Sequence, residues 1–170
     1  PEPPKGITLT EATPCPPASG SAKRVQKFAG EPPTCIDPAR SYTATFETSE
    51  GTFTATLDPK RAPVSVNNFV VLARYHYYDG TPFPRIVPDF VIQGGDGDGS
   101  KGGGWGSNDL GYTIGEEPPA SSSEYADYSL AMAKTSEPNS TGSQFFVVLP
   151  GGGAQLAGVV AGGTLVAVRN

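Results

Sequence analysis

The feature that most constrains this chain is residues 83–96, FPRIVPDFVIQGGD, where an arginine and a glutamine interrupt an apolar run that ends in glycine. Read as a strand, the segment directs Val91 and Gln93 to the same face. Burying a charged side chain without a partner is costly. The residues alone therefore leave two interpretations of Arg85 open: a surface ion pair on a core strand, or a positive group held in a functional site.

Other segments predict a mainly β domain with one early helix. Residues 42–48 and 52–58 alternate and are rich in β-branched and aromatic side chains, and residues 49–51 form a turn, so we expect an antiparallel hairpin. Pro63 suits the first turn of a helix, and apolar side chains follow at helical spacing to about Tyr75. These side chains are Val66, Phe69, Val70 and Ala73.

Two further motifs favour the functional interpretation of Arg85. Residues 129–134 read SLAMAK, and residues 139–148 read NSTGSQFFVV. Together with FPRIVPDFVIQGGD, these motifs resemble the cyclophilins, peptidyl-prolyl cis-trans isomerases built on an eight-stranded barrel. The resemblance is clear over residues 42–149. It implies a cyclophilin-like antiparallel β-barrel with at least one packed helix, in a domain that we place at residues 42–170.

The resemblance assigns catalysis to Arg85. Rotation about a peptide bond must cross ~18–20 kcal/mol, because resonance gives the C–N bond double-bond character. A guanidinium stays charged and can donate hydrogen bonds to the imide nitrogen once its lone pair is released by twisting. Such a reaction requires no nucleophile, metal or cofactor, and we expect none.

The resemblance also implies a peptide-binding cleft beside the arginine. An apolar wall with a few polar anchors is the usual construction of such pockets. The residues expected to bind the proline ring are Phe90, Val91, Phe146 and Leu156. Gln93 and Gln144 would hold substrate carbonyls, and the backbone around Ala133 and Lys134 would pair with the extended peptide.

The end of the chain departs from the family pattern. Leu156 and Gly158 still fit, but beyond them the match is lost, and a second helix and a last strand have no counterpart. We therefore expect a divergent or truncated C-terminal part and an incomplete barrel. Either the proline-rich N-terminal arm or residues 164–168 could partly cover its exposed edge. Departures at the pocket rim, such as Gln155, motivate an alternative function: a catalytically weak module that binds proline-containing segments.

Residues 1–41 predict a proline-rich, extended arm before the domain. The two cysteines of the chain, Cys15 and Cys35, both lie in it. We favour a disulfide, which would stabilise the fold by about 3 kcal/mol through loop closure; two free thiols are the alternative. Two cysteines are too few for a structural metal site. A disulfide would indicate an oxidising compartment, so we expect an extracytoplasmic protein. The suspected resemblance is to a bacterial cyclophilin.

Charge and composition limit the partners. The 170-residue chain carries a net charge of −5, which disfavours nucleic acid, and it contains no apolar run of the ~20 residues that span a membrane. Residues 97–102 fit a glycine-rich dinucleotide motif, but no helix pattern follows, so we read residues 94–106, with Trp105, as a loop. We expect a monomer that acts on proline-containing peptides or unfolded proteins.

Overall fold

The computed structural model describes residues 4–97, 110–156 and 163–169. Within these ranges the chain is mainly β with one α-helix, as predicted. The strands are β1 (Ile7–Thr8), β2 (Val25–Lys27), β3 (Tyr42–Thr48), β4 (Gly51–Leu57), β5 (Arg85–Val87), β6 (Val91–Gly94), β7 (Ser129–Met132), β8 (Phe145–Val148) and β9 (Gly163–Arg169). The helix is α1 (Pro63–Arg74), and two short 3-10 helices are η1 (Ser122–Glu124) and η2 (Gly152–Leu156).

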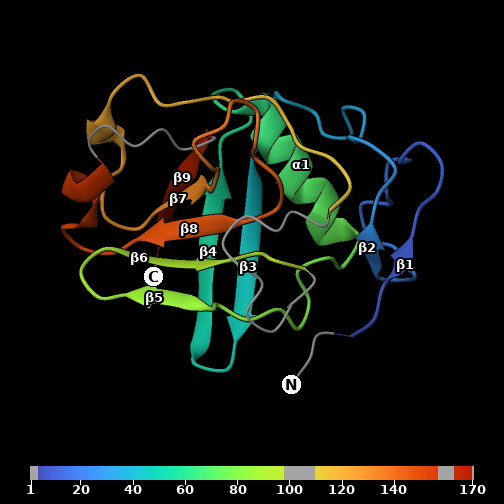
Figure 1. The fold of residues 1–170 in the computed structure, drawn as a ribbon, viewed down its shortest axis with the longest axis horizontal. Helices are drawn as coiled ribbons and strands as arrows, with labels where there is room; N and C mark the ends of the chain where they lie inside the picture. Colours follow the sequence, from blue (N-terminus) through green and yellow to red (C-terminus); the bar gives the residue numbers. More distant parts are fainter. Residues whose placement is uncertain (1–3, 98–109, 157–162, 170) are drawn as a thin grey trace.

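The main sheet has the order β3-β4-β9-β7-β8-β6-β5, with antiparallel neighbours throughout. Figure 1 shows the β3–β4 hairpin running across the direction of β5, β6 and β8, so the sheet is strongly twisted. Among the described strands it does not close on itself, because β3 and β5 each have one neighbour. A closed barrel is therefore not observed among the described strands, and the expected, incomplete β-barrel is not confirmed.

The β3–β4 hairpin forms as its alternation predicts. Its residues pair without a bulge from Tyr42, opposite Leu57, to Thr48, opposite Gly51. The rings of Phe46 and Phe53 stack with centroids 4.5 Å apart, and this cross-strand pair turns the aromatic face of the hairpin toward the core.

Strand β9 corrects our expectation for the C-terminal part. We expected residues 164–168 to cover a sheet edge at most, but β9 lies between β4 and β7, in the middle of the sheet. It pairs Val168 with Ala55 of β4 and Val166 with Leu130 of β7. A run of β-branched residues suits a central strand, and here it joins two parts of the sheet that are distant in sequence.

Helix α1 begins at Pro63, as predicted, and it has a core on each side. Its N-terminus is capped from a distant loop, because the Glu117 carboxylate accepts hydrogen bonds from the Val64 and Ser65 N–H groups at 2.9 and 2.8 Å. The predicted apolar stripe was wrong at Ala73, which is exposed. The helix instead also buries Val71 and Leu72, because the N-terminal segment packs on its second side.

The N-terminal segment contributes Val25 and Phe28 to that second core. It contains the predicted Cys15–Cys35 disulfide, whose Cα atoms lie 5.4 Å apart. Asn67 of α1 accepts a hydrogen bond from the Cys35 N–H at 2.7 Å and donates one to the Pro33 carbonyl at 2.9 Å. These hydrogen bonds attach the N-terminal segment to the helix. The domain boundary at residue 41 stays a prediction.

None of the helices in the described part of the chain has the length and apolar character needed to span a bilayer.

Candidate active site

The β5–β6 hairpin positions Arg85. Its register sets Arg85 opposite Gln93, and the turn places Phe90 so that the Arg85 Cζ atom lies 5.6 Å from the centroid of the Phe90 ring. This is the distance of a cation–π contact. Because Arg85 is half-buried, its charge acts in a less polar medium than bulk water. The guanidinium therefore lies against Phe90, one of the residues of the predicted pocket.

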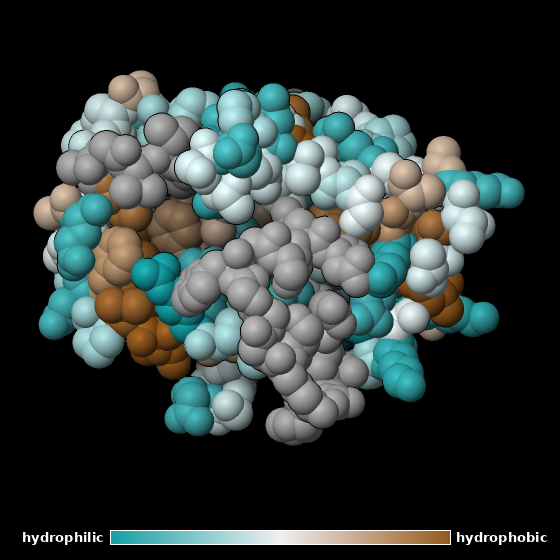
Figure 2. Space-filling view, in the orientation of Figure 1, coloured by the Kyte–Doolittle hydropathy of each residue, from teal (hydrophilic) through white to brown (hydrophobic). Residues whose placement is uncertain are grey.

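The predicted apolar residues meet in one cluster beside the arginine. Strand β8 sets Phe146 opposite Gln93 of β6, and Val91 opposite Val148. Leu156 of η2 is also buried in the cluster, and the partly buried Phe90 and Ala133 pack against it. The buried members are Val91, Tyr125, Ala131, Phe146, Val148 and Leu156. Figure 2 shows hydrophobic side chains gathered around the turn that joins β5 and β6, beside a hollow in the same face.

The two glutamines stand next to each other. The Gln93 amide, 8% exposed, donates from Nε2 to Oε1 of the half-buried Gln144 at 3.1 Å. A glutamine amide has two N–H donors, so both residues retain donor capacity for a peptide carbonyl. Their mutual bond orients both amides before a substrate arrives.

The backbone around Ala133 and Lys134, which we expect to pair with the substrate peptide, already makes hydrogen bonds within the protein. The Ala133 N–H donates to the Gln144 carbonyl at 2.9 Å, so it is not available to a peptide. The Lys134 Nζ donates to the Glu116 carboxylate at 2.6 Å, and that carboxylate also accepts from the Asn139 N–H at 2.7 Å. The Lys134 hydrogen bond is the main cause that lowers the pKa of Glu116 below its usual value. Lys134 thus anchors the loop after β7.

Sequence reasoning missed Tyr125 and the role of η2. Tyr125 follows a run of serines, yet it is 3% exposed, with its ring centroid 6.5 Å from that of Phe146. Gln155 donates from Nε2 to the Asp89 carbonyl at 3.1 Å, which fastens η2 to the β5–β6 turn. An aromatic residue next to a capping box, Ser121 to Glu124, was the available sequence signal for Tyr125.

The fold and the site together define a mainly β protein with a half-buried cation beside an apolar cluster. Residues 43–166 match the family described as cyclophilin type peptidyl-prolyl cis-trans isomerase/CLD. The chain belongs to this family. The match extends past residue 149, the end of the clear resemblance, and it takes in η2 and part of β9.

Individual relatives agree with this assignment. The chain is 43% identical over 103 residues to "Peptidyl-prolyl cis-trans isomerase-like 1" of Neurospora crassa, covering 61% of each protein. It is 39% identical over 114 residues to "Peptidyl-prolyl cis-trans isomerase CYP57" of Arabidopsis thaliana, covering 67% of this chain and 22% of that protein. The chain thus spans less than two thirds of the length of these two relatives.

A solved structure shares the fold. A cyclophilin type peptidyl-prolyl cis-trans isomerase of Cryptosporidium parvum, crystallised in the presence of the dipeptide Ala-Pro, superposes with a TM-score of 0.60 at 29% identity. The superposition covers 75% of this chain and 77% of that one.

Proposed function

We propose that this protein is a peptidyl-prolyl cis-trans isomerase that acts on X-Pro bonds of peptides and unfolded proteins, with Arg85 as its catalytic residue. The observation that carries the proposal is the half-buried Arg85 guanidinium above Phe90, beside the cluster of Val91, Phe146 and Leu156. Family membership and the names of the relatives support the same activity.

The chemistry follows from what changes during rotation. The planar amide delocalises the nitrogen lone pair, whereas the twisted amide localises it and makes the nitrogen a hydrogen-bond acceptor. A guanidinium donor held at that nitrogen stabilises the twisted form more than the planar form, which is the requirement for catalysis. The partial burial of Arg85 strengthens this differential interaction.

The remaining residues hold the substrate still while one bond turns. The apolar cluster would bind the proline ring, and the paired amides of Gln93 and Gln144 would donate to carbonyls of the flanking residues. Fixing both sides of the X-Pro bond restricts the motion to the rotation itself. We assign these binding roles to the residues expected from the sequence, with Tyr125 added as a buried wall of the pocket.

The disulfide supports the finer proposal of an extracytoplasmic location. Cys15 and Cys35 are joined, and disulfides persist mainly in oxidising compartments. A prolyl isomerase there would act on chains that fold after export. A monomer remains our expectation for its state.

The test is an isomerisation assay on a short X-Pro peptide with wild type, Arg85→Ala and Arg85→Lys. Loss of the donors at the transition state predicts about a 100-fold fall in kcat/KM for Arg85→Ala. Lysine keeps the charge but not the fork of donors, so Arg85→Lys should recover little activity. Arg40→Ala removes an exposed arginine elsewhere and should leave the rate unchanged.

Equal rates for wild type and Arg85→Ala would remove Arg85 as the catalyst. Peptide-induced NMR shifts at Phe146 without faster cis-trans exchange in the wild type would favour a binding module instead of an enzyme.

A further inference from the structure

A buried tyrosine connects the second core to the two glutamines of the candidate active site. Tyr77 follows α1, is 3% exposed and packs in the core that the N-terminal segment forms with the helix, with its ring centroid 6.3 Å from that of Phe28. Its hydroxyl contacts Ser143 and Gly97, which belong to the segments that carry the two glutamines. The tyrosine therefore has one end in the core and the other next to the site.

The ladder between β6 and β8 ends before it reaches Gln144. Its last pair is Gly94 opposite Phe145. Gln93 lies within the ladder, whereas Gln144 lies one residue beyond it. The Ala133 N–H holds the Gln144 carbonyl on the β7 side at 2.9 Å. On the β6 side, the spacing of the two glutamines therefore depends on contacts outside the ladder.

The Tyr77 hydroxyl bridges the two chain segments just past the end of that ladder. Its oxygen lies 3.1 Å from the Ser143 Oγ, and it also makes a hydrogen bond with the backbone of Gly97. A Cβ atom built on Gly97 would lie 2.2 Å from the Tyr77 Cζ, so only glycine lets the chain pass this close to the ring. A hydroxyl can donate one hydrogen bond and accept another, so it can serve both partners. The bridge thus joins the residue before Gln144 to the segment that follows Gln93.

The end of the bridge at Gly97 is also held through the backbone. Arg24 donates from Nη2 to the Tyr77 carbonyl at 2.9 Å and to the Gly97 carbonyl at 2.7 Å. Burial is the largest cause that raises the pKa of Tyr77 above its usual value, and the hydrogen bonds with Ser143 and Gly97 act in the opposite direction. The hydroxyl therefore keeps its proton at neutral pH, and the bridge is present under the conditions in which the protein would act.

We infer that Tyr77 is a positioning residue of the isomerase, whose hydroxyl bridge holds the amides of Gln93 and Gln144 at the spacing that accepts two carbonyls of an extended peptide. The inference rests on the proposed function, in which these two amides bind the carbonyls that flank the X-Pro bond. A single hydrogen bond of 3.1 Å joins the two glutamine side chains, so a shift of Ser143 would change their relative position. Because Tyr77 is buried, it acts through Ser143 and Gly97 and not on the substrate itself.

A purely structural role for Tyr77 predicts a different result. A buried hydroxyl that only satisfies its neighbours would stabilise the fold without affecting peptide binding. Tyr75 is the matched case, because it lies in the same core, with its ring centroid 5.5 Å from that of Phe28, and donates its hydroxyl to the Pro14 carbonyl at 2.6 Å. Tyr75→Phe and Tyr77→Phe therefore remove the same group from the same core, but only Tyr77→Phe removes a contact with the segments of the site.

The first experiment measures KM and kcat for an X-Pro peptide with wild type, Tyr77→Phe and Tyr75→Phe. The carbonyls that flank the X-Pro bond do not change during its rotation, so misplaced glutamines should bind the planar and the twisted peptide equally less well. We expect about a fivefold rise in KM for Tyr77→Phe, the effect of about one hydrogen bond, with kcat within about twofold of the wild type. Tyr75→Phe should keep the wild-type KM. An unchanged KM in Tyr77→Phe, or an equal rise in Tyr75→Phe, would overturn the inference.

NMR signals of the glutamine side chains test the positioning in the peptide-free protein, without any reaction. Tyr77→Phe should shift the Nε2–H signals of Gln93 and Gln144 more than Tyr75→Phe does. Ser143→Ala removes the other partner of the hydroxyl and should shift the same signals, so the test remains decisive if Tyr77→Phe fails to fold. Unshifted signals in Ser143→Ala and in folded Tyr77→Phe would overturn the inference alone.

The failure of the proposed function has a different signature. Equal rates for wild type and Arg85→Ala would contradict the proposed catalyst, whatever the glutamine signals show. A wild-type KM with unshifted glutamine signals in Tyr77→Phe would contradict the role of Tyr77 and leave the isomerase proposal standing.

Discussion

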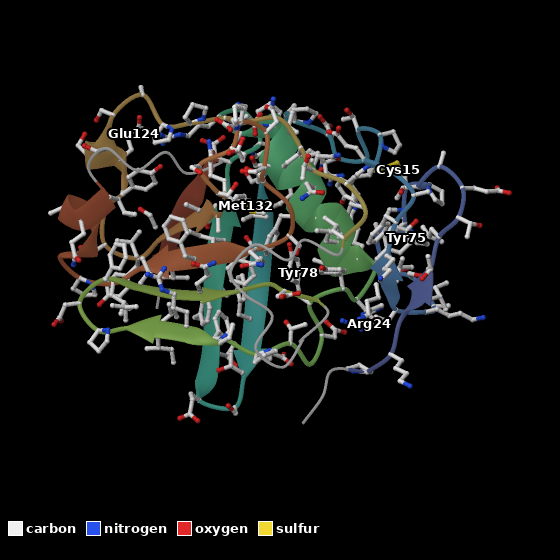
Figure 3. The ribbon with its side chains drawn as sticks, in the orientation of Figure 1. Cys15, Arg24, Tyr75, Tyr78, Glu124 and Met132 are labelled. Atoms are coloured by element: carbon white, nitrogen blue, oxygen red, sulfur yellow. A yellow bond between two sulfur atoms is a disulfide. The ribbon has the colours of Figure 1, made fainter. Side chains whose placement is uncertain are left out.

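Arg24 joins three parts of the chain through its guanidinium. It donates to the His76 carbonyl at 3.1 Å, the Tyr77 carbonyl at 2.9 Å and the Gly97 carbonyl at 2.7 Å, and it also contacts the Pro4 carbonyl. Figure 3 shows it beside β2, near the end of α1. Burial lowers the pKa of Arg24 from its ordinary value, and the nearby Tyr77 and Asp79 act in the opposite direction.

Arg24→Gln should lower the free energy of unfolding by about 3 kcal/mol, because hydrogen bonds to a charged group are lost and the carbonyls remain partly buried. Urea denaturation checks this, with Lys23→Gln at the exposed neighbouring position as the control. A change below about 0.5 kcal/mol, typical of a neutral surface position, would contradict the structural role of Arg24.

Glu116 makes a pH-dependent contribution to stability. Its pKa is lowered in the folded protein, chiefly by the Lys134 hydrogen bond, so the folded state favours the ionised form. The stabilisation is present above the pKa of the unfolded chain, 4.5, and is lost as pH falls through the lowered value. Glu116→Gln should therefore unfold with a weaker pH dependence below about pH 4.5 than the wild type. Parallel curves of unfolding midpoint against pH for both proteins would contradict this.

At the level of elements, η2 depends on a close approach to the β5–β6 turn. A Cβ atom built on Gly152 would lie 2.1 Å from the Phe90 carbonyl oxygen, so only glycine permits this distance. Near the C-terminal end of η2, the hydrogen bond from Gln155 Nε2 to the Asp89 carbonyl also keeps η2 against the β5–β6 turn. Leu156 reaches the apolar cluster because these two contacts set the position of η2.

Gly152→Ala should displace η2 and loosen the pocket. We expect a loss of about 1–3 kcal/mol of stability, as for other overpacked sites, and a fall in kcat/KM that is larger than that of a stability-matched variant elsewhere. Gly115→Ala is the control, because nothing lies within 4 Å of a Cβ at that glycine. Wild-type activity and stability in Gly152→Ala would show that η2 tolerates a shift.

At the scale of the whole molecule, two of the hydrophobic cores lie on either side of α1. The sheet side buries Val66, Phe69 and Val70, and the N-terminal segment buries Val71 and Leu72. Because the helix has neighbours on both sides, the N-terminal segment supports the fold that carries the site without contributing a residue to it.

Removing the disulfide with Cys15→Ser/Cys35→Ser should cost about 3 kcal/mol through the entropy of the opened loop. Isomerase activity of the folded fraction should persist, because Arg85 and its pocket lie on the sheet. Thermal melts with and without reductant check this, and the double variant should be insensitive to reductant. An unchanged melting temperature of the wild type on reduction would contradict a stabilising role.

The sequence by itself determined the features that depend on neighbouring residues. The alternation of residues 42–48 predicted β3, and Pro63 predicted the start of α1. Short-range sterics and strand periodicity decide these features, so a local pattern carries the information.

Only the tertiary structure decided which distant segments meet. It placed β9 inside the sheet, brought Tyr125 to Phe146 and bonded Gln93 to Gln144, none of which a local pattern specifies. These pairings depend on the burial and loop closure of the complete chain, where many arrangements satisfy the same local preferences.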